Sequence, residues 1–163
     1  DRKDVEFPVG GRRLAPGELL ALWLPNGPEL LCLYLACLRT GIVPVPLHRE
    51  MTPPEVGAIL RSSRAKVLIT SGSLLAEAEH AITPNSAQRI YVIGAPARAG
   101  CRDYEELRRE AGAIAPHRGS ADSTGFVLHT SGSDGRAKGV MLSWRNLNEI
   151  LAQRLSSLTD RLR

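Results

Sequence analysis

The sequence LHTSGSDGRAKGVMLSWRNL spans Leu128 to Leu147 and is the most informative part of this chain. An apolar, strand-like run leads into it and ends at Leu128, and a second β-prone run, Val140 to Leu142, follows Lys138. We therefore expect two strands joined by a loop of small hydroxyl residues, glycines and one lysine. Such a loop suits a phosphate chain, because glycines allow close approach, N–H and hydroxyl groups donate hydrogen bonds, and lysine adds positive charge.

This loop differs from the common nucleotide-binding motif G-x-x-x-x-G-K-[ST], because Gly139 follows Lys138 and no helix is expected to begin there. It resembles the phosphate loop of the adenylate-forming enzymes, the superfamily of acyl-CoA synthetases, adenylation domains and luciferases. Their pattern is roughly [YF]-T-S-G-[ST]-T-G-x-P-K-G-V-x-x-S-H-x-N. The matching residues are Thr130, Ser131, Gly132, Ser133, Gly135, Lys138, Gly139, Val140, Ser143 and Asn146. A polar hairpin loop without a ligand is the alternative interpretation.

Three residues depart from the family pattern. Asp134 stands where a threonine is usual, and its carboxylate would either repel a triphosphate or help to hold Mg²⁺, which prefers oxygen ligands. Ala137 replaces a loop proline and removes only some stiffness. Trp144 replaces a histidine, so the role of that histidine is not transferred to this chain.

The resemblance implies a reaction and a set of contacts. Adenylate-forming enzymes activate a carboxylic acid with ATP and Mg²⁺ as an acyl-adenylate, and many then transfer the acyl group to coenzyme A or a carrier protein. The residues implied to bind the β- and γ-phosphates are Thr130, Ser131, Gly132, Ser133, Asp134, Gly135 and Lys138. Lys138 is also the implied catalytic residue, and no residue is assigned as a metal ligand. His129, just before the loop, is expected to pack or to position the loop rather than act as a base.

The region upstream resembles acyl-CoA synthetases as well. Residues 17–70 contain L-P-N-x-P-E before an apolar helix, then L-R-x-G-x-V-x-V-P-L, T-P-x-E and A-K-V-L-I. Together with G-V-M-L-S-W-R-N-L, these segments look closer to fatty acyl-CoA ligases than to peptide-synthetase domains. An aryl-acid or amino-acid adenylation domain remains an alternative within the enzymes.

Periodicity and turn residues predict alternating strands and helices, and hence a three-layer α/β fold with a mostly parallel sheet. We expect this fold to be part of the large N-terminal domain of an adenylate-forming enzyme. The expected strands are 20–24, 42–47, 66–70 and 89–93, and the expected helices are 28–39, 52–63, 73–82, 104–111 and 145–161. Thr52 and Glu55 form a capping-box pattern, and Ser143 can cap the last helix. Residues 94–124 are the most linker-like stretch.

Composition limits the other function classes. The net charge of +4 is modest and comes from scattered arginines, and aromatic residues are few, which argues against nucleic-acid binding. The longest uncharged apolar run, Leu30 to Leu38, is too short to cross a bilayer. The three cysteines have no metal-site spacing and suit a reducing, cytoplasmic compartment. Cys32 and Cys37 are expected in the core. A long-chain fatty acid substrate would add peripheral membrane association.

The resemblance covers only part of the family's N-terminal domain, so we expect a fragment that is inactive by itself. Residues 1–16 are expected to be a divergent or truncated start, and residues 17–163 a partial AMP-binding domain with its phosphate loop at 130–139. The expected partners are a small carboxylic acid, ATP and coenzyme A, with another chain that completes the active site as an alternative. A non-catalytic half domain or gene remnant that binds nucleotide weakly is the alternative from another class.

Overall fold

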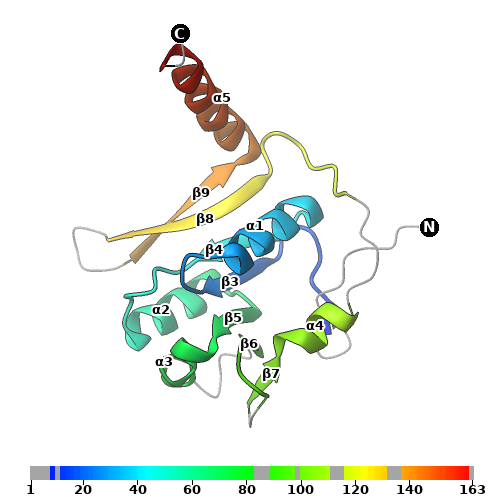
Figure 1. Cartoon of the computed structure of the whole chain (residues 1–163), viewed down its shortest axis with the longest axis vertical. Coiled ribbons are helices and arrows are strands. Elements are labelled where there is room, and N and C mark those ends of the chain that lie inside the picture. The colour runs from blue at the N-terminus through cyan, green and yellow to red at the C-terminus, as the bar shows by residue number, and fades with distance from the viewer. Residues whose placement is uncertain are drawn as a thin grey trace.

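Within its described residues, the chain is built around a five-stranded sheet (Figure 1). The computed structural model describes residues 8–9, 12–82, 89–97, 100–110, 116–131 and 137–161. The spatial order is β4, β3, β5, β6, β7, and every neighbouring pair runs parallel. The bounds are Leu19–Trp23 for β3, Val43–Pro46 for β4, Val67–Ser71 for β5, Arg89–Ile93 for β6 and Cys101–Asp103 for β7.

Helices cover both faces of this sheet, which confirms the three-layer α/β fold. They are α1 (Pro28–Thr40), α2 (Pro53–Ser63), α3 (Leu75–Ala81), which follows the 3-10 turn η1 (Gly72–Leu74), and α4 (Tyr104–Glu110). Leu22 and Tyr91 belong to the apolar cluster of α1 and α4, whereas Trp23 and Leu68 belong to that of α2 and α3. Because side chains alternate along a strand, each strand contributes to both layers.

Local sequence signals set the helix and strand ends as expected. The capping box at the start of α2 is present, and both the N–H and the hydroxyl of Thr52 donate to Glu55 Oε2 at 2.7 Å. Helix α1 ends at Gly41, whose φ of 74° lies in the left-handed region that glycine adopts without strain. The prolines Pro44 and Pro46 lie in β4, an edge strand, where missing N–H donors are tolerated.

A hairpin and a long helix complete the fold. Strands β8 (Thr124–Ser131) and β9 (Ala137–Ser143) pair antiparallel, and α5 (Trp144–Arg161) follows them. In Figure 1 the hairpin lies on the β4 side of the sheet, and α5 projects away from it. Near the N-terminus, β1 (Pro8–Val9) pairs with β2 (Arg12–Arg13). None of the helices in the described part of the chain is long and apolar enough to cross a membrane.

Two expectations from the sequence, one about residues 94–124 and one about Cys32, are wrong. The linker-like stretch 94–124 contains β7, which adds the last parallel strand beside β6. This strand has only three residues and two of them are charged, so it carries no apolar pattern. Cys32 was expected in the core but is exposed, whereas Cys37 is buried. Positions five apart do not share a helix face, so only one of these cysteines can face the sheet.

Candidate functional site: the β8–β9 hairpin

The predicted phosphate loop connects β8 to β9 and so lies at the turn end of the hairpin. Thr130 pairs directly with Lys138, and Ser131 pairs with Ala137 beyond them. Directly opposed residues of an antiparallel pair project to the same face, with Cβ atoms about 5 Å apart. Thr130 and Lys138 are both exposed. The fold therefore brings a hydroxyl donor and a positive charge side by side at the edge of the predicted loop.

Only some of the other predicted phosphate-binding residues lie within the described residues. Ser131 is the last residue of β8. Gly132, Ser133, Asp134 and Gly135 fall in 132–136, outside the described residues, and their roles stay predictions. The strands on either side fix where this segment begins and ends.

His129 lies on the other face of the hairpin, next to Thr130. Burial lowers the pKa of its imidazole below the ordinary value of 6.5, and its Nδ1 has no hydrogen-bond partner within the described residues. Gly139 is directly opposite, and a Cβ atom built there would lie 3.4 Å from His129 Nε2. A methyl group there would be in ordinary contact with the ring, so the half-buried imidazole packs close to the Gly139 backbone. The placement favours packing over proton transfer.

A cavity of about 420 Å³ lies beside Thr130. Buried apolar residues of its wall include Leu24, Leu30 and Leu47, and exposed polar residues include Asn26, His48, Arg49 and Glu50. The wall comes from α1, from β8 and from the loops that follow β3 and β4. The chain runs from β3 outward to β4 and then returns past β3 to β5, and ligands of doubly wound sheets bind at the carboxyl ends of strands near such a reversal.

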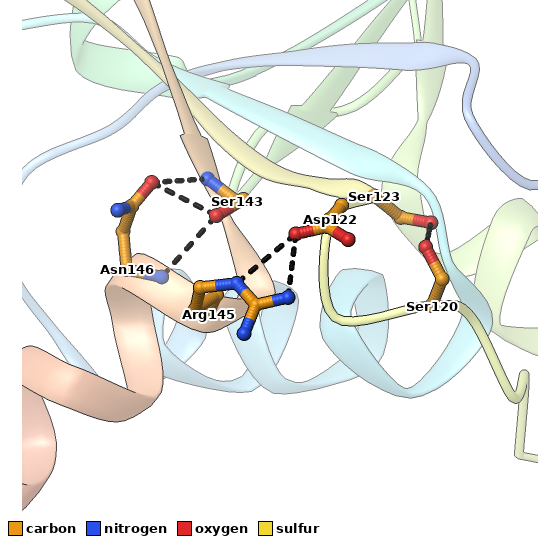
Figure 2. A network of polar contacts seen from close by, with 6 residues as sticks. All are labelled: Ser120, Asp122, Ser123, Ser143, Arg145 and Asn146. Atoms are coloured by element: carbon orange, nitrogen blue, oxygen red, sulfur yellow. Dashed lines mark hydrogen bonds and ion pairs between the residues drawn. The ribbon is translucent and has the colours of Figure 1, made fainter.

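The other end of the hairpin, where β9 leads into α5, is fixed by a reciprocal cap (Figure 2). The N–H and hydroxyl of Ser143 donate to Asn146 Oδ1 at 3.0 and 2.9 Å, and the N–H of Asn146 donates back to Ser143 Oγ at 3.2 Å. This satisfies donors at the start of α5 that the helix itself leaves unpaired. The structure confirms Ser143 as the cap, and it gives Asn146, another motif position, a structural partner that the sequence did not predict.

The loop before β8 reinforces the same end, as Figure 2 shows. Arg145 donates from Nε and Nη2 to Asp122 Oδ1 at 3.0 and 2.9 Å. The N–H groups of Trp144 and Arg145 donate to the carbonyl oxygens of Ser123 and Ala121 at 3.0 and 2.8 Å. The Asp122–Arg145 ion pair is exposed and adds little by itself, but the backbone bonds tie the start of β8 to the start of α5.

Trp144, which replaces the histidine of the pattern, is the first residue of α5 and is half buried. It lines a second cavity of about 400 Å³ together with His117, Arg118 and Asn148. It therefore lies at the start of α5, at the end of the hairpin away from the predicted loop.

Comparison with known proteins agrees with this arrangement. The sequence model of a family described as AMP-binding enzyme matches residues 12–162. The long-chain-fatty-acid–CoA ligase FadD13 of Mycobacterium tuberculosis is 31% identical over 153 residues, which are 92% of this chain and 29% of that protein. The fold is similar to that of the Brucella canis acyl-CoA synthetase, with a TM-score of 0.72 and 23% identity over 81% of this chain and 24% of the other.

The ATP-bound structure of MatB from Rhodopseudomonas palustris is similar as well. It has a TM-score of 0.69 and 29% identity, and the match covers 83% of this chain and 26% of MatB. The chain thus spans 29% of FadD13 and smaller shares of the two solved structures.

Proposed function

The chain belongs to the AMP-binding enzyme family, and on that basis we propose that its β8–β9 hairpin binds the phosphate groups of ATP in an ATP-dependent acid–CoA ligase. The observation that carries the proposal is the pairing of Thr130 with Lys138 at the turn end of the hairpin. Both residues match the family's phosphate-loop pattern, and both side chains are exposed beside the loop.

The chemistry of the pair suits this role. A lysine ammonium is a compact positive charge with three hydrogen-bond donors, and a threonine hydroxyl adds a fourth donor on the same face. In the proposed reaction, a carboxylate attacks the α-phosphate and pyrophosphate leaves. Lys138 and Thr130 would hold the leaving phosphates and offset the charge that develops on them, which is the main contribution a protein makes to phosphoryl chemistry.

Mg²⁺ is part of the same proposal. Within the described residues no group of three or more His, Cys, Asp and Glu side chains could hold a metal ion. Mg²⁺ is usually bound through substrate phosphates, water and one or two carboxylates. Asp134, the carboxylate of the loop itself, is our candidate for such a contact.

The substrate proposal follows the relatives. FadD13 is named a long-chain-fatty-acid–CoA ligase, and we propose a fatty or related carboxylic acid as the acyl substrate and coenzyme A as the acceptor. These finer assignments concern a whole ligase, because this chain aligns with only 29% of FadD13.

The test is carboxylate-dependent ATP–pyrophosphate exchange by the polypeptide that carries this chain in its own cell. We expect Lys138→Ala to slow the exchange by on the order of 100-fold, because a preorganised donor to the leaving group is lost. Lys66→Ala, which removes an equal charge from a lysine that pairs with Glu18, is the matched control and should leave the rate unchanged. Equal rates in the wild type and Lys138→Ala would overturn the assignment of the hairpin.

A further inference from the structure

We propose that the sheet carries a second anion site at the amino-terminal ends of β6 and β7, in which Arg89 and Arg102 bind a phosphate group of a small molecule. The arginine pocket has a volume of about 260 Å³ and is lined by Arg89, Ile90, Gly100, Cys101 and Arg102. None of these residues belongs to the β8–β9 hairpin, so the inference does not depend on the function proposed above.

The arginine pocket and the cavity beside Thr130 lie at opposite ends of the parallel strands. Arg89 is the first residue of β6, and its N–H donates to the carbonyl oxygen of Lys66 at 3.1 Å. Cys101 is the first residue of β7. The pocket is therefore formed where these strands begin, whereas the cavity beside Thr130 lies where β3 and β4 end. Because the strands are parallel, the amino-terminal and carboxyl-terminal ends lie on opposite sides of the sheet.

Both arginines project to the same face of the sheet. Arg102 pairs with Tyr91, and Tyr91 follows Arg89 by two positions, so all three share the face that packs against α1 and α4. Ile90 and Cys101 project to the other face, where they cluster with Leu75 of α3. The two arginines thus lie on one face of the sheet, at diagonal positions of neighbouring strands, and both line the pocket.

One guanidinium nitrogen of Arg89 is buried without a hydrogen-bond partner among the described residues. This nitrogen is Nη1, and it is shielded from water. A buried donor without a partner is costly, and more so when it carries charge, so each such group calls for an explanation such as a bound ion. The residues that line the pocket include no carboxylate.

Carboxylates near the pocket are engaged elsewhere. Asp103 accepts the N–H of Glu105 at 2.9 Å, and Glu105 pairs with Arg108 at 3.0 Å. Glu79 approaches the Cys101 thiol at 3.8 Å from α3, on the face opposite the arginines. The sequence of the adjoining segments 83–88 and 98–99 contains no aspartate or glutamate.

These features fit a phosphate group better than other ligands. A guanidinium group offers a planar pair of donors that matches two phosphate oxygens, and its charge strengthens each bond. Arg102 is exposed and gives access from solvent. A Cβ atom built on Gly100 would meet nothing within 4 Å, so space remains beside this backbone. The pocket also has room for part of the molecule that carries the phosphate.

The test is a titration of the chain with inorganic phosphate and, separately, with ATP, followed by the amide resonances of Gly100, Cys101 and Arg102. Ionic strength is held constant with sodium chloride at about 0.15 M, because screening would otherwise change with the ligand. We expect saturable shifts at these amides. Saturation by phosphate alone identifies the free anion as sufficient, and saturation only by ATP identifies the phosphate of a larger molecule.

Three variants separate this binding from general charge effects. Arg89→Gln should weaken the binding seen at these amides about tenfold or more, the loss expected for one charge-assisted contact. Arg102→Gln, at an exposed position, should weaken it similarly and serves if Arg89→Gln does not fold. Arg109→Gln removes the same charge from α4 outside the pocket and should leave the affinity within about twofold. Absence of shifts at the three amides with either ligand, or equal affinities in all variants, would overturn the proposal.

Discussion

Lys138 lies directly opposite Thr130 in the β8–β9 hairpin, on the same face of its two strands. At the other end of the same strands, Ser143 and Asn146 close the hairpin onto α5 with reciprocal hydrogen bonds. The hairpin therefore has one end that is anchored to α5 and one end that carries the predicted loop. The strand register shifts between Thr124 and Phe126, next to the anchored end, and the regular pairing beyond this shift places the two side chains that we propose to bind phosphate.

The cap should contribute measurable stability. We expect Ser143→Ala to lower the free energy of unfolding by about 1 kcal/mol, the usual cost of losing an N-cap side chain. In a double-mutant cycle with Asn146→Ala, the two losses should be less than additive, because each residue's bond needs the other. Urea denaturation measures both. Ser157→Ala, which removes a hydroxyl bonded to the Arg154 carbonyl within the same helix, is the control and should cost much less. Strict additivity would show that the two side chains act independently.

Gly57→Ala should destabilise the fold, although helix propensity alone would predict stabilisation. Alanine normally stabilises a helix interior by about 1 kcal/mol relative to glycine. A Cβ atom built on Gly57 would lie 2.6 Å from the carbonyl oxygen of Ala81, where α2 packs against the end of α3. We therefore expect Gly57→Ala to destabilise the fold by about 1 to 3 kcal/mol, the cost of overpacking. Ala58→Gly at the exposed neighbouring position reports propensity alone. A stabilised Gly57→Ala variant would contradict the close packing of α2 on α3.

The two cysteines of α1 should differ strongly in reactivity. Cys32 is exposed, whereas burial raises the pKa of the Cys37 thiol to about 12. The thiolate is the reactive form, so at about pH 8 Cys37 is both protonated and inaccessible. Alkylation with iodoacetamide, followed by peptide mass spectrometry, should label Cys32 first and Cys37 only when the protein unfolds. Equal labelling rates in the native protein would show that α1 does not pack with Cys37 toward the sheet.

His129 should make the fold less stable in mild acid. Burial holds the pKa of its imidazole below the ordinary 6.5 in the folded state, so the unfolded chain takes up the proton more readily. Stability is then highest above this ordinary pKa and falls as the pH drops below it. His129→Phe keeps an aromatic ring and removes the titration, so the variant should lose less stability than the wild type between about pH 7.5 and pH 5.5. Thermal unfolding at the two pH values measures the difference.

The other three histidines are present in both proteins and cancel in that comparison. Identical losses of stability in wild type and His129→Phe would mean that the imidazole is not desolvated beside Gly139.

The sequence predicted the elements that local physics defines. The capping box of Thr52 and Glu55, the stop at Gly41 and the apolar runs of β3 and β5 each carry their own signal, and the structure confirms them. Strand β7 has no such signal, because its three residues form a strand only through pairing with β6. The bonds from Trp144 and Arg145 to residues 121–123 depend on tertiary contacts, which one sequence does not reveal. The same holds for the burial of Arg89 Nη1, which has no hydrogen-bond partner in the part of the chain that the structure describes.

The most direct test of the hairpin assignment is a titration of the chain with Mg²⁺ and ATP, followed at the amide resonances of Thr130, Lys138 and Gly139. We predict saturable shifts at these amides in the wild type and in Lys66→Ala, and an affinity at least about tenfold lower in Lys138→Ala, because one charge-assisted phosphate contact is lost. Shifts at Gly100 to Arg102 in the same spectra report the arginine pocket separately. The assignment would be contradicted if the resonances of positions 130, 138 and 139 did not shift. It would also be contradicted if the wild type and Lys138→Ala gave equal affinities.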